Sequence, residues 1–589
     1  MKRYYNIIAL LIILFGSIAC EDLKFGEDFL EKPVSDELSV DSVFAQKAYA
    51  DQALNQVYKS LPDFMPTLGG YNPEGFILDV FSDIGYTERL SWVTGAVTAS
   101  SGRHCFPYQI SHKEILGDPT FGIRKAHIYL ENVDKVPDMS AEEKKIRKAE
   151  VKVIIAMHYI QMLRFFGGVP LIDHAYTAEE DFNLPRMTVE ETVDSTVLLL
   201  DEAAKDLPWT TTNEEFGHMT AAVAKALKFR LLHFAASPLF NSTQPYMAGE
   251  AADLKLTWYG DFQQERWETA MKAGIEFLEL NNQNGNYYQI ENSGDPQEDY
   301  VKGYFVKGSH EAIMVSFRWA IYLRWYKPFR MYEGGYGAPR GNYADMFQWK
   351  DGTDFDWNNP VHAANPFFDD NGNPTRDARL YETLLVNRDK WQGRKSEVYN
   401  GGREGYGSGS KVGKKTQYGY GFRKFVRDKS NEVHNKPYSC PLIRIPEIYL
   451  GMAEVMNQLG KATVKDQQGR DAYDYLNIVR NRAGLPDVTS NDVSPGEDLW
   501  QFLMDERARE FGQEEVRYFD IVRNKRGDWV SRPMEMLETT IAGQSPLKFN
   551  YNVSVRDDIK YLWKDNWYLL PFPMSEVNKK YGLVQNPGW

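Results

Sequence analysis

The sequence predicts a mainly α-helical protein in which pairs of helices support an irregular, loop-rich subdomain. Helix start and stop signals recur through residues 140–280 and again from residue 441 onward. The stretch between them is dense in Gly, Asn, Asp, Tyr and Trp, a composition typical of loops. We therefore predict one domain with a helical scaffold over about 36–280 and 441–589 and a variable subdomain over about 281–440.

Capping signals and small side chains define the scaffold helices. Ser140 with Glu143 has the spacing of a capping box, and so has Thr188 with Glu191. The first helix is predicted to stop at Gly167. Consecutive helices with alanine at their contacts indicate stacked hairpins of tetratricopeptide type. Further helices are predicted over residues 220–236, 263–280, 448–459, 472–482 and 499–511.

The first residues of the chain have the pattern of an export signal. Lys2 and Arg3 precede a short apolar run over residues 7–18, too short to span a membrane, and Cys20 follows. A cysteine at this place is typical of a bacterial lipoprotein signal, in which the thiol is acylated. We therefore predict a signal peptide over residues 1–19 and a lipid anchor on Cys20. The alternative is an ordinary secretory signal in which the cysteine is incidental.

Charge and cysteine content exclude other classes. The formal net charge is −14 at pH 7, a poor match for nucleic acid, which is bound through clustered Lys and Arg. The chain has three cysteines, so it cannot depend on a dense disulfide framework. If Cys20 carries lipid, Cys105 and Cys440 remain, and the sequence leaves open whether they pair.

The sequence contains only incomplete versions of motifs that bind cofactors. His310 and Glu311 begin a zinc-protease motif, but Met314 stands where the second histidine is needed. Residues 409–416 lack the first glycine and the final hydroxyl of a phosphate-binding loop. Residues 369–372 favour a turn over a calcium loop. We predict no cofactor; a structural calcium ion is possible, but no motif supports it.

Residues 505–523 form the densest charged stretch of the chain. Glu506 and Glu510 lie one helical turn apart, a spacing that paired catalytic carboxylates of a glycoside hydrolase can have. Arginines close by lower carboxyl pKa values, however, whereas a general acid needs a raised one. A structural ion-pair network is therefore favoured. The pairs predicted from spacing are Asp505 with Arg509 and Glu514 with Arg517.

Several segments together resemble the SusD/RagB family of outer-membrane nutrient-binding lipoproteins. The charged stretch resembles the family's Glu-Arg helix, and Glu21-Asp22 after the cysteine also fits. The other matching segments are residues 165–171, 444–454, 481–485, 570–573 and 585–589. The resemblance covers essentially the whole chain, except that residues 281–440 match loosely.

The resemblance implies a function as well as a SusD-like fold. Such proteins look like lids on a SusC-like TonB-dependent transporter, capturing oligosaccharide outside the cell and delivering it into the barrel without catalysis. It also implies an outer-membrane protein that is lipid-anchored and exposed on the cell surface. Two alternatives stay open: a lid of the same fold that captures peptides, and a surface glycoside hydrolase.

Sugar recognition needs aromatic rings for the C–H face of the sugar and polar groups for its hydroxyl edge. Two loop-like stretches supply both, residues 71–92 and 317–336, and Trp349 with Trp357 is a weaker third candidate. The alternative is that Phe317 and Trp319 belong to the buried face of a strand. The residues predicted to contact sugar are Trp92 and Trp325 as stacking platforms, with Trp319, Tyr71, Tyr322, Arg89 and Asp83.

Overall fold

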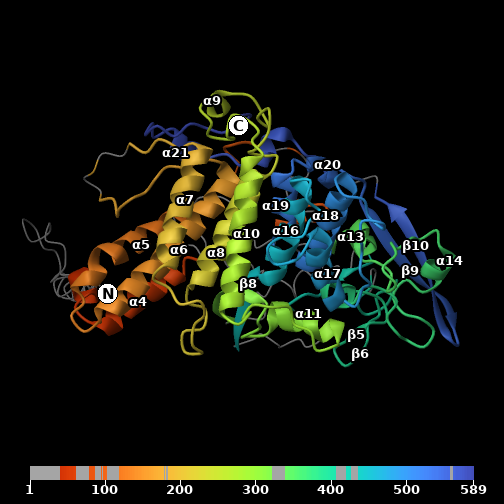
Figure 1. Cartoon of the computed structure of the whole chain (residues 1–589). Coiled ribbons are helices and arrows are strands. Elements are labelled where there is room, and N and C mark those ends of the chain that lie inside the picture. Colours follow the sequence, from red (N-terminus) through yellow and green to blue (C-terminus); the bar gives the residue numbers. More distant parts are fainter. Residues whose placement is uncertain are drawn as a thin grey trace, which may run out of the picture.

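The computed structural model is mainly helical, as predicted (Figure 1). One side of the molecule is a row of long helices, and the other side combines a second helical block with strands and irregular segments. The residues that the structure describes are 40–61, 78–86, 95, 97–101, 119–177, 180, 183–320, 338–405, 419–425, 436–556 and 561–589.

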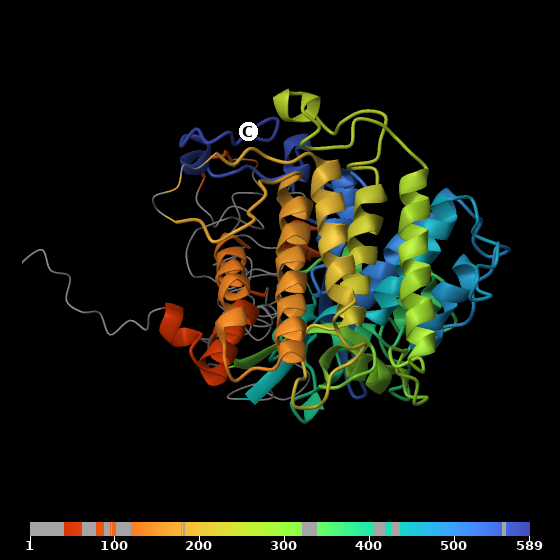
Figure 2. The same ribbon diagram turned by 60° about the vertical axis from the view of Figure 1, so that its left-hand side comes forward.

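The long helices stand side by side in chain order (Figure 2). Each of the last five packs against the next, which is the arrangement expected of stacked helical hairpins. The helices are α4 (Lys47–Tyr58), α5 (Pro119–Asn132), α6 (Ala141–Phe166), α7 (Val189–Ala204), α8 (Ala221–Ala236) and α10 (Glu265–Gln283). The bounds of the last four lie within one turn of the predicted ones, whereas α4 and α5 were not predicted as individual helices.

Both predicted capping residues begin a helix. Thr188 and Glu191 form the complete box at α7: the Glu191 amide donates to the Thr188 hydroxyl (3.1 Å) and the Thr188 amide to the Glu191 carboxylate (2.8 Å). Ser140 accepts from the Glu143 amide at α6 (3.2 Å), while the Glu143 carboxylate pairs with Lys47 instead. The capping box of Ser140 and Glu143 is therefore half formed.

A second helical block packs against the row. α16 (Ile445–Gln458) contacts α8 and α10 on one side and α17 (Ala472–Arg482) and α18 (Glu497–Phe511) on the other. α19 (Arg517–Arg523) follows α18 and packs against it. Because α16 touches both groups of helices, it joins the two blocks of the scaffold.

The variable stretch is irregular, as predicted, and its two ends are paired. β2 (Ala312–Ala320) includes Phe317 and Trp319, for which a strand was the alternative, and it lies antiparallel to β8 (Lys436–Arg444). The long segment between these strands therefore begins and ends at neighbouring residues. Short elements occupy the interval. They are β3 (Ala338–Pro339), α13 (Gly341–Met346), α14 (Pro360–Ala364), α15 (Leu380–Thr383), β4 (Leu384–Leu385), β5 (Lys390–Trp391), β6 (Arg394–Lys395) and β7 (Gly421–Phe422); α11 (Pro296–Phe305) precedes β2.

A long hairpin lies in the stretch that we assigned to the helical scaffold. β9 (Glu535–Gln544) pairs antiparallel with β10 (Leu547–Val555) and extends along the side of the molecule opposite α4 (Figure 1). The helical assignment of residues 441–589 is wrong there. The remaining elements are α3 (Val40–Val43), η1 (Leu78–Phe81), β1 (Gly85–Tyr86), η3 (Val133–Lys135), α9 (Glu250–Asp253), α20 (Gly527–Val530), η5 (Asp565–Tyr568) and α21 (Met574–Val577).

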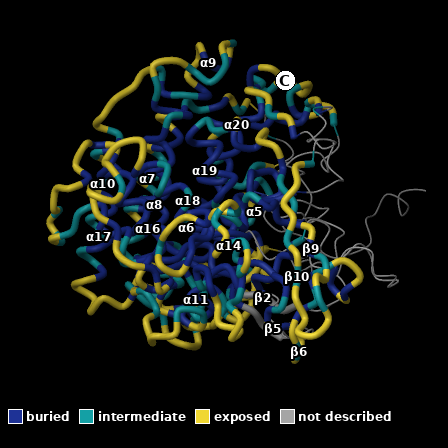
Figure 3. Tube along the Cα trace, turned by 90° about the vertical axis from the view of Figure 1, so that its right-hand side faces the viewer, coloured by how far each residue is buried: buried dark blue, intermediate teal, exposed yellow. Residues whose placement is uncertain are grey.

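The apolar core fills the interior of the molecule, between the helices (Figure 3). α6 is buried on every side from Val153 to Phe166, because α5, α7 and α8 all pack against it. A helix without an exposed face needs such a central place. Among the described helices none combines the length and the apolar character that a membrane span requires. Cys20 lies outside the described residues.

Candidate functional site

Two short strands join the regions that contain the predicted sugar-binding stretches. β1 and β3 pair antiparallel, with Gly85 opposite Pro339 and Tyr86 opposite Ala338. Trp92 follows β1 in the chain and Trp325 precedes β3, so the described residues from which both stretches continue are neighbours. Trp92, Trp325, Tyr71, Tyr322 and Arg89 themselves lie outside the described residues, and their roles stay predictions.

Gly85 keeps β1 against the preceding turn. A Cβ atom at this position would lie 2.5 Å from the carbonyl oxygen of Asp79, which is closer than any side chain tolerates. Only glycine therefore allows η1 and β1 to approach this closely.

Asp83, one of the predicted sugar contacts, forms an ion pair with Arg517. Its carboxylate accepts from Arg517 at 2.8 and 2.7 Å, and the residue is 4% exposed. Burial opposes ionisation, but the charge and hydrogen bonds of Arg517 outweigh it and lower the pKa of Asp83. The ion pair holds the turn before β1 against α19. A contact between Asp83 and a ligand stays a prediction.

A polar cavity of about 300 Å³ opens beside Asp83, and we call it the polar cavity. Carboxylates, amides and guanidinium groups line it, the residue types that hydrogen-bond hydroxyls. α13 and α18 supply most of them. Its polar lining includes Asp83, Asn342, Asp345, Gln501, Asp505 and Arg532. Sequence reasoning missed Asn342, Asp345 and Gln501, because no local signal places α13 opposite α18.

Two carboxyl groups of the polar cavity have raised pKa values. Burial raises the pKa of Asp345 to about 7, although Arg376 and two contacts from Trp357 Nε1 (3.0 and 3.1 Å) favour its charged form. Burial also raises the pKa of Asp505, which accepts from Gln501 Nε2 (3.2 Å). A protonated carboxyl can donate as well as accept, so Asp345 suits a ligand rich in hydroxyls.

Replacing Asp345 with asparagine is expected to flatten the pH dependence of stability. The carboxyl ionises near 3.8 in the unfolded chain and near 7 in the fold, so the wild-type free energy of unfolding decreases as the pH rises from about 4 to 7. The decrease due to this group is at most about 4 kcal/mol. Urea unfolding across this range would measure it. Met346→Leu, which removes no titratable group from the same cavity, is the control and should keep the wild-type slope; an Asp345→Asn slope equal to wild type would contradict the expectation.

The other candidate tryptophans are accounted for by packing where the structure describes them. Trp349 is 8% exposed and stacks on His362 at 4.2 Å between ring centroids. Trp357 donates to Asp345 and packs edge-on against Phe355. For Trp319 the structure describes only the backbone, which lies in β2 opposite Pro437. The third candidate pair is therefore not a free stacking platform.

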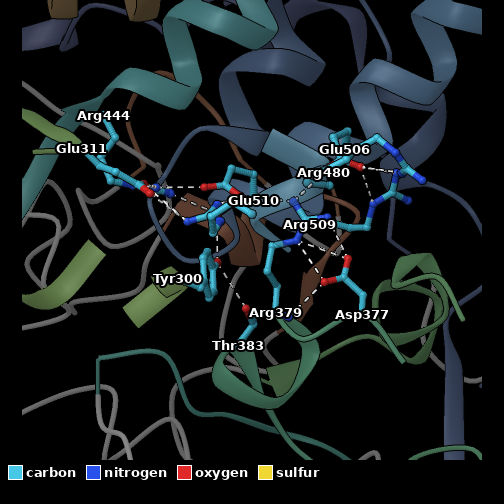
Figure 4. Close-up of polar contacts among 12 residues, drawn as sticks. Tyr300, Glu311, Asp377, Arg379, Thr383, Arg444, Arg480, Glu506, Arg509 and Glu510 are labelled. Carbon is cyan, nitrogen blue, oxygen red and sulfur yellow. Dashed lines mark hydrogen bonds and ion pairs between the residues drawn. The ribbon is translucent and has the colours of Figure 1, made fainter. Parts of the chain in front are cut away.

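The charged stretch of α18 is a buried ion-pair network (Figure 4). Glu510 contacts Arg444 (2.8 Å), Arg379 (3.2 Å) and Arg482. Glu506 contacts Arg379 (2.7 Å) and Arg509 (2.8 Å). The network was predicted, and it is confirmed.

The pairs that spacing predicted within this stretch are wrong. Arg509 pairs with Glu506 and Arg517 with Asp83, while Glu514 accepts from Arg444 (2.7 Å) and Lys424 (2.5 Å). The side chains point into the interior, where partners from other elements are nearer than helix neighbours.

The carboxylates of the network do not suit acid catalysis. Both Glu506 and Glu510 are fully buried, so a polysaccharide has no access to them. Burial opposes their ionisation, but arginine charges lower the pKa of Glu506 to about 2 and that of Glu510 further. A general acid needs the opposite shift. These two residues hold the fold together.

Metal chemistry has no support in the described part of the chain. No group of three or more His, Cys, Asp or Glu side chains is placed there to hold an ion. Asp369 forms the predicted turn, accepting from the Asn373 amide (2.8 Å) and side chain (2.9 Å). Cys440 is buried in β8 and Cys105 lies outside the described residues, so their pairing stays open.

The architecture defines a structural class, in which paired helices carry an irregular face with a polar cavity. The SusD family model matches residues 272–589, and the chain belongs to this family. A comparison with curated proteins gave no match.

Solved structures share the fold. A SusD-like protein from Bacteroides fragilis has a TM-score of 0.71 at 22% identity, with 95% of this chain and 100% of that chain covered. A SusD-like carbohydrate-binding protein from the same species has a TM-score of 0.64 at 20% identity, with 91% and 99% covered. Surface glycan-binding protein A from Bacteroides thetaiotaomicron has a TM-score of 0.56 at 16% identity, with 92% and 100% covered.

Proposed function

We propose that this protein is a cell-surface lipoprotein that binds glycan and delivers it to a SusC-like TonB-dependent outer-membrane transporter. The pairing of β1 with β3 carries the proposal. It brings together, next to the polar cavity, the described residues from which both aromatic stretches continue. Membership of the SusD family supports it. Structural relatives named as laminarin-binding and surface glycan-binding proteins add further support.

The chemistry of the site matches an oligosaccharide. The polar cavity offers carboxyl, amide and guanidinium groups for hydroxyls, at a volume that holds one or two sugar rings. Trp529, which also lines it, is fully buried and cannot stack on a ligand. The stacking platforms that we propose stay Trp92 and Trp325, in the stretches that continue from β1 and β3.

We infer capture without catalysis. The only paired carboxylates that the sequence offered for glycoside hydrolysis, Glu506 and Glu510, are buried and held ionised by arginines. An acylated Cys20 would hold the protein at the outer membrane, and no described helix could span it instead.

Replacing Trp92 and Trp325 together with alanine is expected to abolish glycan binding. Stacking of an aromatic ring on the flat face of a sugar is a substantial contact. Loss of both platforms leaves only polar contacts, for which water competes. A glycan array would first identify the ligand, and calorimetry would then compare the variants. The melting temperature should stay close to that of wild type.

The matched control is Tyr49→Ala with Phe262→Ala. Both rings are exposed, at 38% and 52%, and lie on the helical half of the molecule. This control should bind glycan as wild type does. Unaltered affinity in the Trp92/Trp325 variant would reject the site, and a wild-type protein that binds peptides and no glycan would reject the ligand class.

A further inference from the structure

A second and larger cavity, of about 560 Å³, lies at the C-terminal end of the chain, and we call it the C-terminal cavity. It opens where α5 begins, α6 ends and the segment around α21 returns across them; Figure 1 shows α21 at the upper end of the helical row. It shares no lining residue with the polar cavity. Its apolar lining includes Phe121, Met162, Tyr176, Phe572, Tyr581 and Leu583.

The walls of the C-terminal cavity are held in place by hydrogen bonds. The Leu570 amide donates to the Phe165 carbonyl (2.7 Å), and Asn586 Nδ2 donates to the Phe166 carbonyl (3.0 Å). The Leu184 amide donates to the Tyr581 carbonyl (3.0 Å). The C-terminal segment is thereby fixed against the end of α6.

The cavity presents an apolar floor and partly exposed aromatic walls. Phe572 and Leu583 at its floor are buried, whereas Phe121, Tyr176 and Tyr581 are half-buried. Half-buried rings around an apolar floor gain from covering by an apolar group, because water leaves both surfaces.

Two arginines at this cavity form no ion pair with a described carboxylate. Arg186 lies over the ring of Phe572, 4.9 Å from the ring centroid. Within the part of the chain that the structure describes, its N–H groups donate to neutral oxygens, those of Gly168, Phe166, Leu256, Val584 and Asn586. Arg124 lines the cavity, is exposed, and forms no ion pair with any described residue.

The acidic side chains that line the cavity or face it are engaged, as far as the structure describes them. Glu576 pairs with Lys579 (2.9 Å) and accepts from the Tyr581 hydroxyl (3.2 Å). On the facing loop, Asp173 and Glu180 are bonded to the two ring nitrogens of His174, at 2.7 and 2.6 Å. Among the described residues, Arg124 and Arg186 therefore have no acidic partner at this apolar cavity, in a chain of net charge −14.

We propose that the C-terminal cavity binds a small amphipathic anion: an aromatic or short aliphatic group that carries a carboxylate. The apolar part covers Phe572 and Leu583, and the carboxylate meets the Arg124 guanidinium at the rim. Burying an apolar body of this size provides most of the affinity, and the guanidinium selects for the anion. The site is separate from the proposed glycan site and does not depend on it.

Calorimetry with 4-phenylbutyrate and 4-phenylbutan-1-ol tests this proposal on the purified full-length chain. The two compounds share an apolar body and differ in charge. The acid should bind at least about tenfold more tightly than the alcohol, a difference of about 1.4 kcal/mol. Arg124→Gln should remove that preference and leave the alcohol unaffected. Lys135→Gln, an exposed cation beyond the other end of α5, is the control and should keep it.

A second variant tests the cavity itself. Leu184 is half-buried in the loop that forms one wall, so Leu184→Trp should fill the space without disturbing the core and should abolish binding of both compounds. Its melting temperature and glycan affinity should match wild type. Equal affinity for acid and alcohol, an Arg124→Gln variant that still prefers the acid, persistent binding by Leu184→Trp, or no saturable binding to wild type would each overturn the proposal.

Discussion

Replacing Glu510 with glutamine is expected to lower the free energy of unfolding by about 3–5 kcal/mol. Glu510 is fully buried on α18 and contacts three arginines, Arg379, Arg444 and Arg482. Those arginines are also fully buried, so loss of the carboxylate leaves positive charge without water or a partner. Breaking one partner of such a network costs far more than the net contribution of an exposed ion pair.

Urea unfolding at pH 7 measures the effect, with Glu497→Gln as the control. Glu497 begins the same helix and is exposed, so its loss removes only a favourable charge near the helix N-terminus and should cost less than about 1 kcal/mol. A Glu510→Gln variant as stable as this control would contradict a structural role. Loss of oligosaccharide turnover in the folded variant would instead favour the hydrolase alternative.

The helical half of the fold follows from local sequence signals. α17 begins and ends at the predicted residues, Ala472 and Arg482, and Thr188 caps α7 through the predicted box. Capping and apolar periodicity act over one or two turns, so they can be recognised without knowing the partners of a helix.

The network partners could not be predicted in the same way. Local spacing paired Asp505 with Arg509, but the partners of Glu510 come from β8, α17 and the turn before α15. Which arginine reaches a buried carboxylate depends on how distant elements pack. The sequence therefore predicts that a network exists and leaves its connections open.

The β9–β10 hairpin has a strand signal in its sequence. Phe549, Tyr551 and Val553 alternate with polar residues, the period of a strand with one covered face. The family resemblance and the helices before it favoured a helical assignment. Tyr551 packs against Phe367 from the variable stretch, so the hairpin covers part of the irregular half.

The candidate site is predictable in composition and not in assembly. The aromatic stretches stand out in the sequence, whereas β1 and β3, which join them, have two residues each. Strands this short have no periodicity to recognise. Asp83 was predicted as a sugar contact, and no signal in the sequence indicates its ion pair with Arg517, which bridges more than four hundred residues of chain.

Replacing Cys20 with alanine is expected to release the protein from the cell surface while leaving its ligand affinity unchanged. The proposed acyl group on Cys20 is the anchor, and no described helix is able to take its place. Both cavities lie within the folded chain and involve no residue near the signal, so calorimetry should give wild-type affinities.

Labelled palmitate and surface proteolysis of intact cells would follow the anchor directly, with Cys105→Ala as the control. We expect label and surface signal in wild type and in this control, and neither in Cys20→Ala. Growth on the bound glycan should fail with Cys20→Ala, because a lid must stay beside its transporter to deliver what it captures. A Cys20→Ala protein that stays on the surface and supports uptake would show that another contact, such as the transporter itself, retains it.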